Sequence, residues 1–141
     1  MGKPKLKFKD LQVGQQFPAW ERGGINIELF QAYGEASGDG NPMHTDEEYA
    51  RDLGYPGVFA QGMLIMAFAA KYVADLAGTG AIERIQSRFR KQTWPGETLR
   101  FTATVTAKKE EGGKKLVTLD VKGTNLEGEE KLLGEAVVLA G

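Results

Sequence analysis

Apolar and polar residues alternate through the second half of the chain in the pattern of an antiparallel sheet. In residues 99–107 every second residue is apolar and arginine or threonine residues lie between, which is the period of a strand with one buried face. Residues 117–121 repeat this alternation, and segments 81–94 and 132–139 indicate two further strands. Because one face of this predicted meander is apolar, it needs a cover. Glycine-containing turns separate the strands at residues 95–96, 111–113 and 127–129.

The first half of the chain has the spacing of helices. Residues 26–37 place apolar residues on one broad face, with Asn26 as the N-terminal cap. A shorter helix is predicted to begin at the capping-box pair Thr45 and Glu48 and to end at Gly54. The residues of this shorter helix that should face inward are Tyr49, Ala50 and Leu53.

A third helix, residues 62–78, is apolar in almost every direction, so it is predicted to be buried. Only Lys71 and Asp75, one turn apart, indicate an exposed stripe, and Met63 and Met66 are expected in the core. This helix can cover the apolar face of the meander. The predicted fold class is therefore α+β, an antiparallel sheet wrapped around a long central helix, in a single domain that takes up the whole chain.

Composition narrows the classes of function. The chain of 141 residues has 18 basic and 19 acidic residues, a net charge of −1, so nothing in the balance favours nucleic acid or an anionic membrane as a partner. It has no cysteine and one histidine, which excludes disulfides, a cysteine nucleophile and a histidine-rich metal site within one chain. No apolar run has the roughly 20 residues of a membrane-spanning helix. A soluble cytoplasmic protein without a metal is expected.

The segment ASGDGNPMHTD, residues 36–46, contains the single histidine, His44, and a nearby carboxylate, Asp39. Glycine on both sides of Asp39 frees the backbone, and Pro42 stiffens the approach to His44. A carboxylate and an imidazole in one short loop can hold a water molecule and transfer its protons. The same residues are also typical of a turn without function, and the pattern alone leaves both interpretations open.

Two further groups could contact a substrate. Gly62 begins the buried helix, where backbone N–H groups have no partner within the helix, so its N–H could hold the oxygen of a carbonyl. A helix start without function is the alternative. Arg84, Arg88 and Arg90 lie in the first predicted strand of the meander, where they form a solvated face or bind a phosphate-bearing ligand.

Residues 33–50, YGEASGDGNPMHTDEEYA, resemble the signature of the MaoC-like dehydratases, also called (R)-specific enoyl-CoA hydratases or hydratase 2. The later segment GVFAQGML, residues 57–64, is similar to the block that opens the central helix in that family. The turn that begins at Trp94-Pro95-Gly96 is also similar. The matching residues of the first block are Ser37, Gly38, Asp39, Asn41, Pro42, His44 and Ala50.

The resemblance implies a hotdog fold and a dimer whose two sheets join edge to edge. It implies reversible hydration of a trans-2-enoyl thioester to the (R)-3-hydroxyacyl thioester, carried on coenzyme A or acyl carrier protein, with no further cofactor. In that reaction Asp39 and His44 would activate water, the Gly62 N–H would bind the thioester oxygen, and Asn41 would support the loop. Ala36 and Met43 depart mildly from the family's branched aliphatic residues, and two departures matter more, Gln61 in place of histidine and Ala70 in place of serine.

Two other functions compete with the hydratase. The chain could be a non-catalytic or partner-dependent subunit that binds acyl thioesters, such as one half of a heterodimer, although it retains both Asp39 and His44. It could be a thioesterase, which would use a carboxylate on the central helix, where Asp75 is the only acid. The remaining candidates for substrate contact are Gln61, Arg88 and Arg90.

Overall fold

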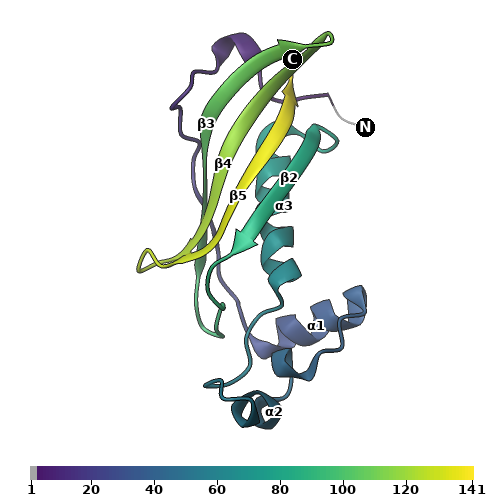
Figure 1. Cartoon of the computed structure of the whole chain (residues 1–141), viewed down its shortest axis with the longest axis vertical. Helices are drawn as coiled ribbons and strands as arrows, with labels where there is room; N and C mark the ends of the chain where they lie inside the picture. The colour runs from purple at the N-terminus through teal and green to yellow at the C-terminus, as the bar shows by residue number, and fades with distance from the viewer. Residues whose placement is uncertain (1–2) are drawn as a thin grey trace.

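In the computed structural model, which describes residues 3–141, five antiparallel strands form one curved sheet. The strand order is β1-β3-β4-β5-β2, so β1 and β2 are the two edges of the sheet. Figure 1 shows the long strands side by side, with α3 lying along one face of the sheet. This arrangement confirms the predicted α+β class. The strands are β1 (Trp20–Arg22), β2 (Ile82–Phe89), β3 (Leu99–Glu111), β4 (Lys114–Asn125) and β5 (Glu130–Ala140).

The alternation in the sequence sets which face of the sheet is buried. In β3, Leu99 through Val105 are buried at every second position, as predicted. The register then shifts at an irregularity between Val105 and Ala107, so Ala107 is exposed although the alternation predicted it on the apolar face. A bulge adds a residue and reverses the facing of those that follow. The alternation in β4 holds, with Val117, Leu119 and Val121 buried.

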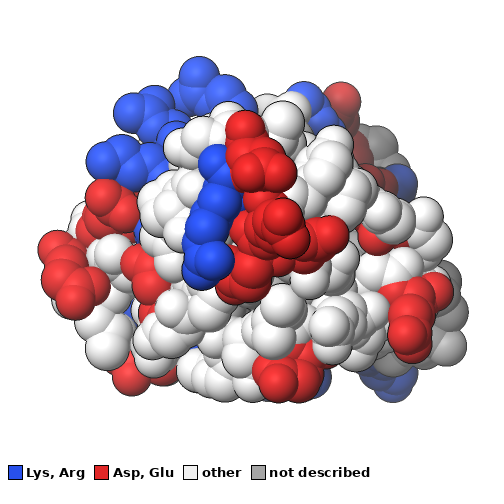
Figure 2. Space-filling view, turned by 90° about the horizontal axis from the view of Figure 1, so that it is seen from below, with Lys and Arg blue, Asp and Glu red and all other residues white. Residues whose placement is uncertain are grey.

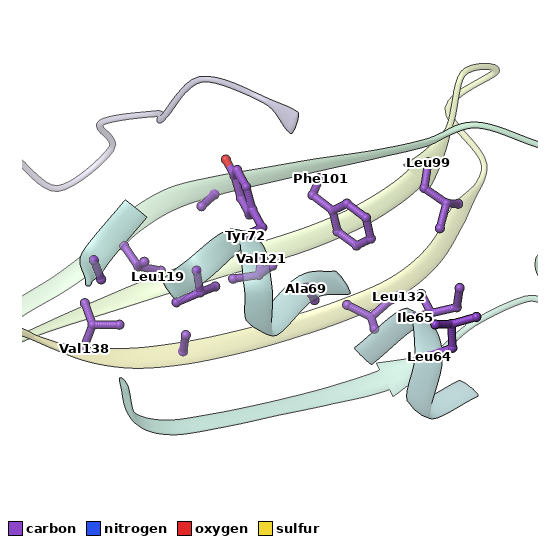
Figure 3. Close-up of a cluster of buried hydrophobic side chains, with 14 of the residues drawn as sticks. Leu64, Ile65, Ala69, Tyr72, Leu99, Phe101, Leu119, Val121, Leu132 and Val138 are labelled. Atoms are coloured by element: carbon purple, nitrogen blue, oxygen red, sulfur yellow. The ribbon is translucent and has the colours of Figure 1, made fainter. Parts of the chain in front are cut away.

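Helix α3 (Gly62–Ala77) covers the apolar face of the sheet and forms the centre of the core. Figure 3 shows Leu64, Ile65 and Ala69 of this helix directed towards side chains of β3, β4 and β5. The prediction of a buried helix is confirmed. The prediction that Met63 lies in the core is wrong, because 59% of Met63 is exposed.

Helices α1 (Ile27–Ser37) and α2 (Glu47–Asp52) lie together at one end of the molecule (Figure 1). Asn26 caps α1 as predicted, since its side chain accepts a hydrogen bond from the Leu29 N–H at 2.9 Å. The predicted capping box of α2 is wrong: Asp46 is the cap, and its side chain accepts from the Tyr49 N–H. An aspartate at the cap position competes directly with the threonine before it.

The predicted inward face of α2 is correct only for Ala50, which is fully buried. Tyr49 and Leu53 are 42% and 54% exposed, so this short helix buries a single small residue. Because α2 has only six residues, few of its side chains can face the core.

The first predicted strand ends earlier than its sequence suggested. Strand β2 stops at Phe89, and residues 91–94 leave the sheet after a last hydrogen bond from the Arg90 N–H to the Lys131 carbonyl of β5 at 2.8 Å. The Thr93 carbonyl accepts a hydrogen bond from the Ala60 N–H at 2.9 Å, which attaches this segment to the residues that precede α3. A loop beside the N-terminus of the central helix replaces the end of the strand. No helix among residues 3–141 is both long and apolar enough to cross a lipid bilayer.

Candidate active site

The loop between α1 and α2 is shaped by hydrogen bonds from side chains to its own backbone. Gly38 ends α1 with a φ of +79°, a conformation that glycine adopts without a steric penalty. One Asp39 carboxylate oxygen accepts from the Asn41 N–H, and the Asn41 side-chain oxygen accepts from the Met43 N–H, each at 3.2 Å. Asn41 thereby caps the short 3-10 helix η2 (Pro42–His44). The geometry fits the loop-supporting role proposed for Asn41.

His44 is buried, and its ring is held in one orientation. Its Nδ1 atom lies 2.8 Å from the Phe59 carbonyl oxygen. A carbonyl only accepts hydrogen bonds, so Nδ1 carries a proton and the neutral ring keeps its lone pair on Nε2. The Phe59 ring also meets the imidazole edge-on, with 5.0 Å between ring centroids. Nε2 is therefore the nitrogen that can take or give a proton.

Gly34, in the last turns of α1, lets the loop fold back onto the helix. A Cβ atom at this position would lie 2.9 Å from the Asp39 carbonyl oxygen, closer than such atoms approach in proteins. It would also lie 3.6 Å from the Gln61 side-chain nitrogen. The body of α1, the backbone of Asp39 and the side chain of Gln61 thus meet at one point.

Gln61 directly precedes α3 and is 1% exposed. Its side-chain nitrogen donates to the Phe30 carbonyl oxygen at 2.8 Å, and this bond ties α1 to the start of α3. Its side chain does not cap α3, so it does not bind the N–H groups in the first turn of that helix. Its side-chain oxygen has no hydrogen-bond partner among the described residues. Gln61 therefore connects two helices through its side chain, and this role does not require a titratable group.

Gly62 lies on a pocket of about 250 Å³ between the start of α3 and the end of β2. The Phe89 ring is packed over Gly62, about 3.0 Å from where a Cβ atom would be, so a larger residue would meet the ring. Arg90 also lines this pocket, whereas Arg88 lines a separate hollow on the sheet with Asp120 and Glu130. The structure therefore separates the two arginines that the sequence grouped together.

Asp39 and His44 are not among the residues that line the pocket at Gly62. Phe59 connects the two parts: its carbonyl holds the His44 ring, and the residue itself lines the pocket. Asp75, the carboxylate that the thioesterase alternative requires, is exposed and ion-paired with Lys71 at 2.6 Å near the far end of α3. Among residues 3–141 no cluster of three or more histidine, aspartate or glutamate residues could hold a metal ion.

Lys131 is a buried charge that the sequence did not single out. It is 1% exposed, and its ammonium donates at 2.7 Å both to the Gln92 carbonyl and to Glu129. It also lies 3.1 Å from a carboxylate oxygen of Glu97. Burial raises the pKa of Glu97, but the hydrogen bonds from Asn125, the Trp94 N–H and Lys131 outweigh it and leave that pKa below its ordinary value. This network fastens the loop that forms one wall of the pocket.

Charge is distributed unevenly over the molecule. Residues 23–61 contain seven acidic side chains and one basic side chain, Arg51, so the remaining residues contain twelve acidic and seventeen basic side chains. Figure 2, which looks onto the end where α1 and α2 lie, shows acidic side chains gathered in the middle of the view beside a basic one. The end that carries Asp39 and His44 is therefore negatively charged.

Comparison with known proteins gives consistent matches. The sequence profile of the MaoC like domain matches residues 13–126. The chain is 34% identical over 135 residues to an (R)-specific enoyl-CoA hydratase of Rhodospirillum rubrum, which covers 94% of this chain and 90% of that protein. It is 38% identical over 66 residues to the peroxisomal enoyl-CoA hydratase 2 of Arabidopsis thaliana, but this match spans only 21% of that longer protein.

Solved structures agree with the fold. The unliganded R-hydratase PhaJ1 of Pseudomonas aeruginosa superposes with a TM-score of 0.84 at 26% identity, over 97% of this chain and 86% of that one. The ChsH1-ChsH2 complex of Mycobacterium tuberculosis matches with a TM-score of 0.79 at 24% identity, over 92% of this chain and 98% of that one. The second match shows the same fold in a protein that assembles from two kinds of chain.

Proposed function

The chain belongs to the MaoC-like domain family, and from this membership we propose that it hydrates a trans-2-enoyl thioester to the (R)-3-hydroxyacyl thioester and catalyses the reverse dehydration. It is an enzyme of the hydratase and dehydratase class, like its relative of almost the same length from Rhodospirillum rubrum. The carrier of the acyl group is coenzyme A or acyl carrier protein, and the reaction needs no cofactor beyond it.

The orientation of His44 supports this proposal most directly. Because the Phe59 carbonyl fixes the proton on Nδ1, the free Nε2 can exchange a proton with water or substrate. Asp39, five residues earlier in the same constrained loop, supplies a carboxylate. The oxygen of water forms a bond to C3 of the enoyl group, one proton of that water passes to the pair, and the pair delivers a proton to C2. The two groups act on one water, so we assign the steps to the pair.

The N-terminus of α3 serves the carbonyl. When water adds at C3, negative charge develops on the thioester oxygen before C2 is protonated. We assign the binding of this oxygen to the Gly62 N–H, which lies at the positive end of a 16-residue helix. The side chain of Gln61 keeps that helix end attached to α1 and hence to the loop of Asp39.

The deciding experiment follows the loss of enoyl absorbance with crotonyl-CoA and longer trans-2-enoyl-CoA substrates. We expect Asp39→Asn and His44→Ala each to lower kcat/KM at least about 100-fold, the scale expected for loss of acid/base catalysis. Asp52→Asn is the matched control, because Asp52 is an exposed acid of the same charged end. Equal activity in wild type and variants would contradict the site, and thioester hydrolysis alone would contradict the reaction class.

A partner-dependent subunit is the second candidate. The match to a complex of two different chains favours this candidate over other non-catalytic roles. It predicts an inactive purified chain that regains hydratase activity when a second, related chain is added. A homodimer joined edge to edge is our preferred assembly, since β2 is an uncovered edge of the sheet.

A further inference from the structure

The pocket beside Gly62 has two walls that are far apart in the sequence. One wall is the start of α3 with the residues before it, and the other is the loop at residues 89–93. The hydrogen bond from the Ala60 N–H to the Thr93 carbonyl joins the walls at 2.9 Å. Lys131 lines the pocket too, and its bond to the Gln92 carbonyl holds the second wall in place. These two hydrogen bonds fix both walls, so the pocket is a defined part of the fold.

Thr93 belongs to this wall and has an unpaired hydroxyl. The residue is 2% exposed and lines the pocket, and its Oγ1 has no hydrogen-bond partner among residues 3–141. Leaving a buried hydroxyl unpaired costs free energy, so nearly all such groups in folded proteins have a partner. Because Thr93 lines this pocket, a ligand held there is the candidate partner for the hydroxyl.

The chemistry of the substrate supplies that partner, an argument that rests on the proposed function. If the Gly62 N–H holds the thioester oxygen, the rest of the thioester continues from sulfur through two methylene groups to an amide. Ile65 and Phe89 give the pocket apolar surface for the methylene groups. A threonine hydroxyl can either donate to the amide oxygen or accept from the amide N–H.

We infer that Thr93 is a substrate-contacting residue, whose hydroxyl binds the first amide of the pantetheine arm. Coenzyme A and the prosthetic arm of acyl carrier protein share this amide. They also share a phosphate farther along the arm, which the exposed Arg90 at the same pocket can meet. Thr93 thus distinguishes a pantetheine thioester from a simple alkyl thioester.

The test compares two small substrates that differ in this amide. S-crotonyl-N-acetylcysteamine contains it, and S-butyl thiocrotonate lacks it. Thr93→Val removes the hydroxyl while keeping the shape, and Thr93→Ser keeps a hydroxyl. We expect Thr93→Val to lower the ratio of kcat/KM between the amide and amide-free substrates about 3- to 10-fold, the worth of one hydrogen bond. Thr93→Ser should keep the wild-type ratio.

Other results would overturn the inference. An unchanged ratio in Thr93→Val, with equal losses on both substrates, would give Thr93 a structural role only, and a lower unfolding midpoint of this variant would accompany it. Crotonyl-CoA and crotonyl-acyl carrier protein are assayed in parallel, and the carrier that wild type prefers must show the Thr93→Val loss. If wild type hydrates none of these thioesters, the proposed function fails first; if it hydrates them with no Thr93 effect, only this inference fails.

Discussion

The His44 ring is oriented by a backbone carbonyl, so its orientation does not depend on a charged side chain. The Phe59 carbonyl that holds Nδ1 belongs to the segment leading into α3, three residues before Gly62. A movement of that segment would change the imidazole and the helix end together. In the proposed mechanism, proton transfer and carbonyl binding therefore depend on one segment of backbone.

At the same scale, Glu97 should make stability depend on pH. Its pKa lies below the ordinary value of 4.5, so it contributes stability above that pH, which is lost as pH falls through the folded-state pKa. We expect Glu97→Gln to lower the unfolding midpoint at about pH 7, and to reduce the decrease seen between about pH 6 and about pH 3. Calorimetry measures both. Glu127→Gln, in an exposed turn, is the control, and an equal acid-induced decrease in the Glu97 and Glu127 variants would refute the expectation.

Among the elements, those whose sequence pattern repeats over many residues were predictable, and those fixed by single contacts were not. The alternation of β3 and the apolar surface of α3 recur over many residues, so the sheet and its central helix followed from the sequence. The bulge after Val105 and the early end of β2 depend on tertiary hydrogen bonds that leave no local pattern. Strand β1, three residues long, was missed for the same reason.

The candidate site divides in the same way. The loop of Asp39 and His44 was found from its residue types and from a family signature, whereas Thr93 and Lys131 were not. Each of these two directly follows another polar residue, Gln92 or Glu130, as an exposed residue would, and only the folded structure shows that it is buried. Arg88 and Arg90 were grouped by sequence, yet they line different hollows.

The contact between α1 and the loop gives a prediction at the scale of elements. Alanine is usually favoured over glycine inside a helix by about 1 kcal/mol. In Gly34→Ala, however, the new methyl group would lie 2.9 Å from the Asp39 carbonyl oxygen and displace the loop. We expect destabilisation of about 1–3 kcal/mol and a loss in kcat/KM of about 10-fold or more.

Gly40→Ala is the matched control for this substitution. Its methyl group would meet no atom within 4 Å, and the φ of Gly40 is not in the left-handed region. Denaturant unfolding and crotonyl-CoA hydration measure the two effects. A Gly34→Ala variant that is more stable than wild type and fully active would show that the loop is not fixed by this contact.

For the whole molecule, the open edge of the sheet and the exposed Phe89 at its end predict self-association. We expect sedimentation equilibrium to give twice the 15.4 kDa mass of the chain. Specific activity should fall on dilution to concentrations at which the dimer dissociates. A monomer with undiminished activity would contradict the edge-to-edge assembly.

The presence of one histidine in the chain turns the site into its own spectroscopic probe. Every imidazole signal in a nuclear magnetic resonance spectrum of this protein belongs to His44, so no assignment by mutation is required. The Nδ1 proton is enclosed in a 2.8 Å hydrogen bond, which slows its exchange with solvent, while Nε2 reports directly on what approaches the ring. Ligand binding and proton uptake at the site can therefore be followed in the unmodified protein.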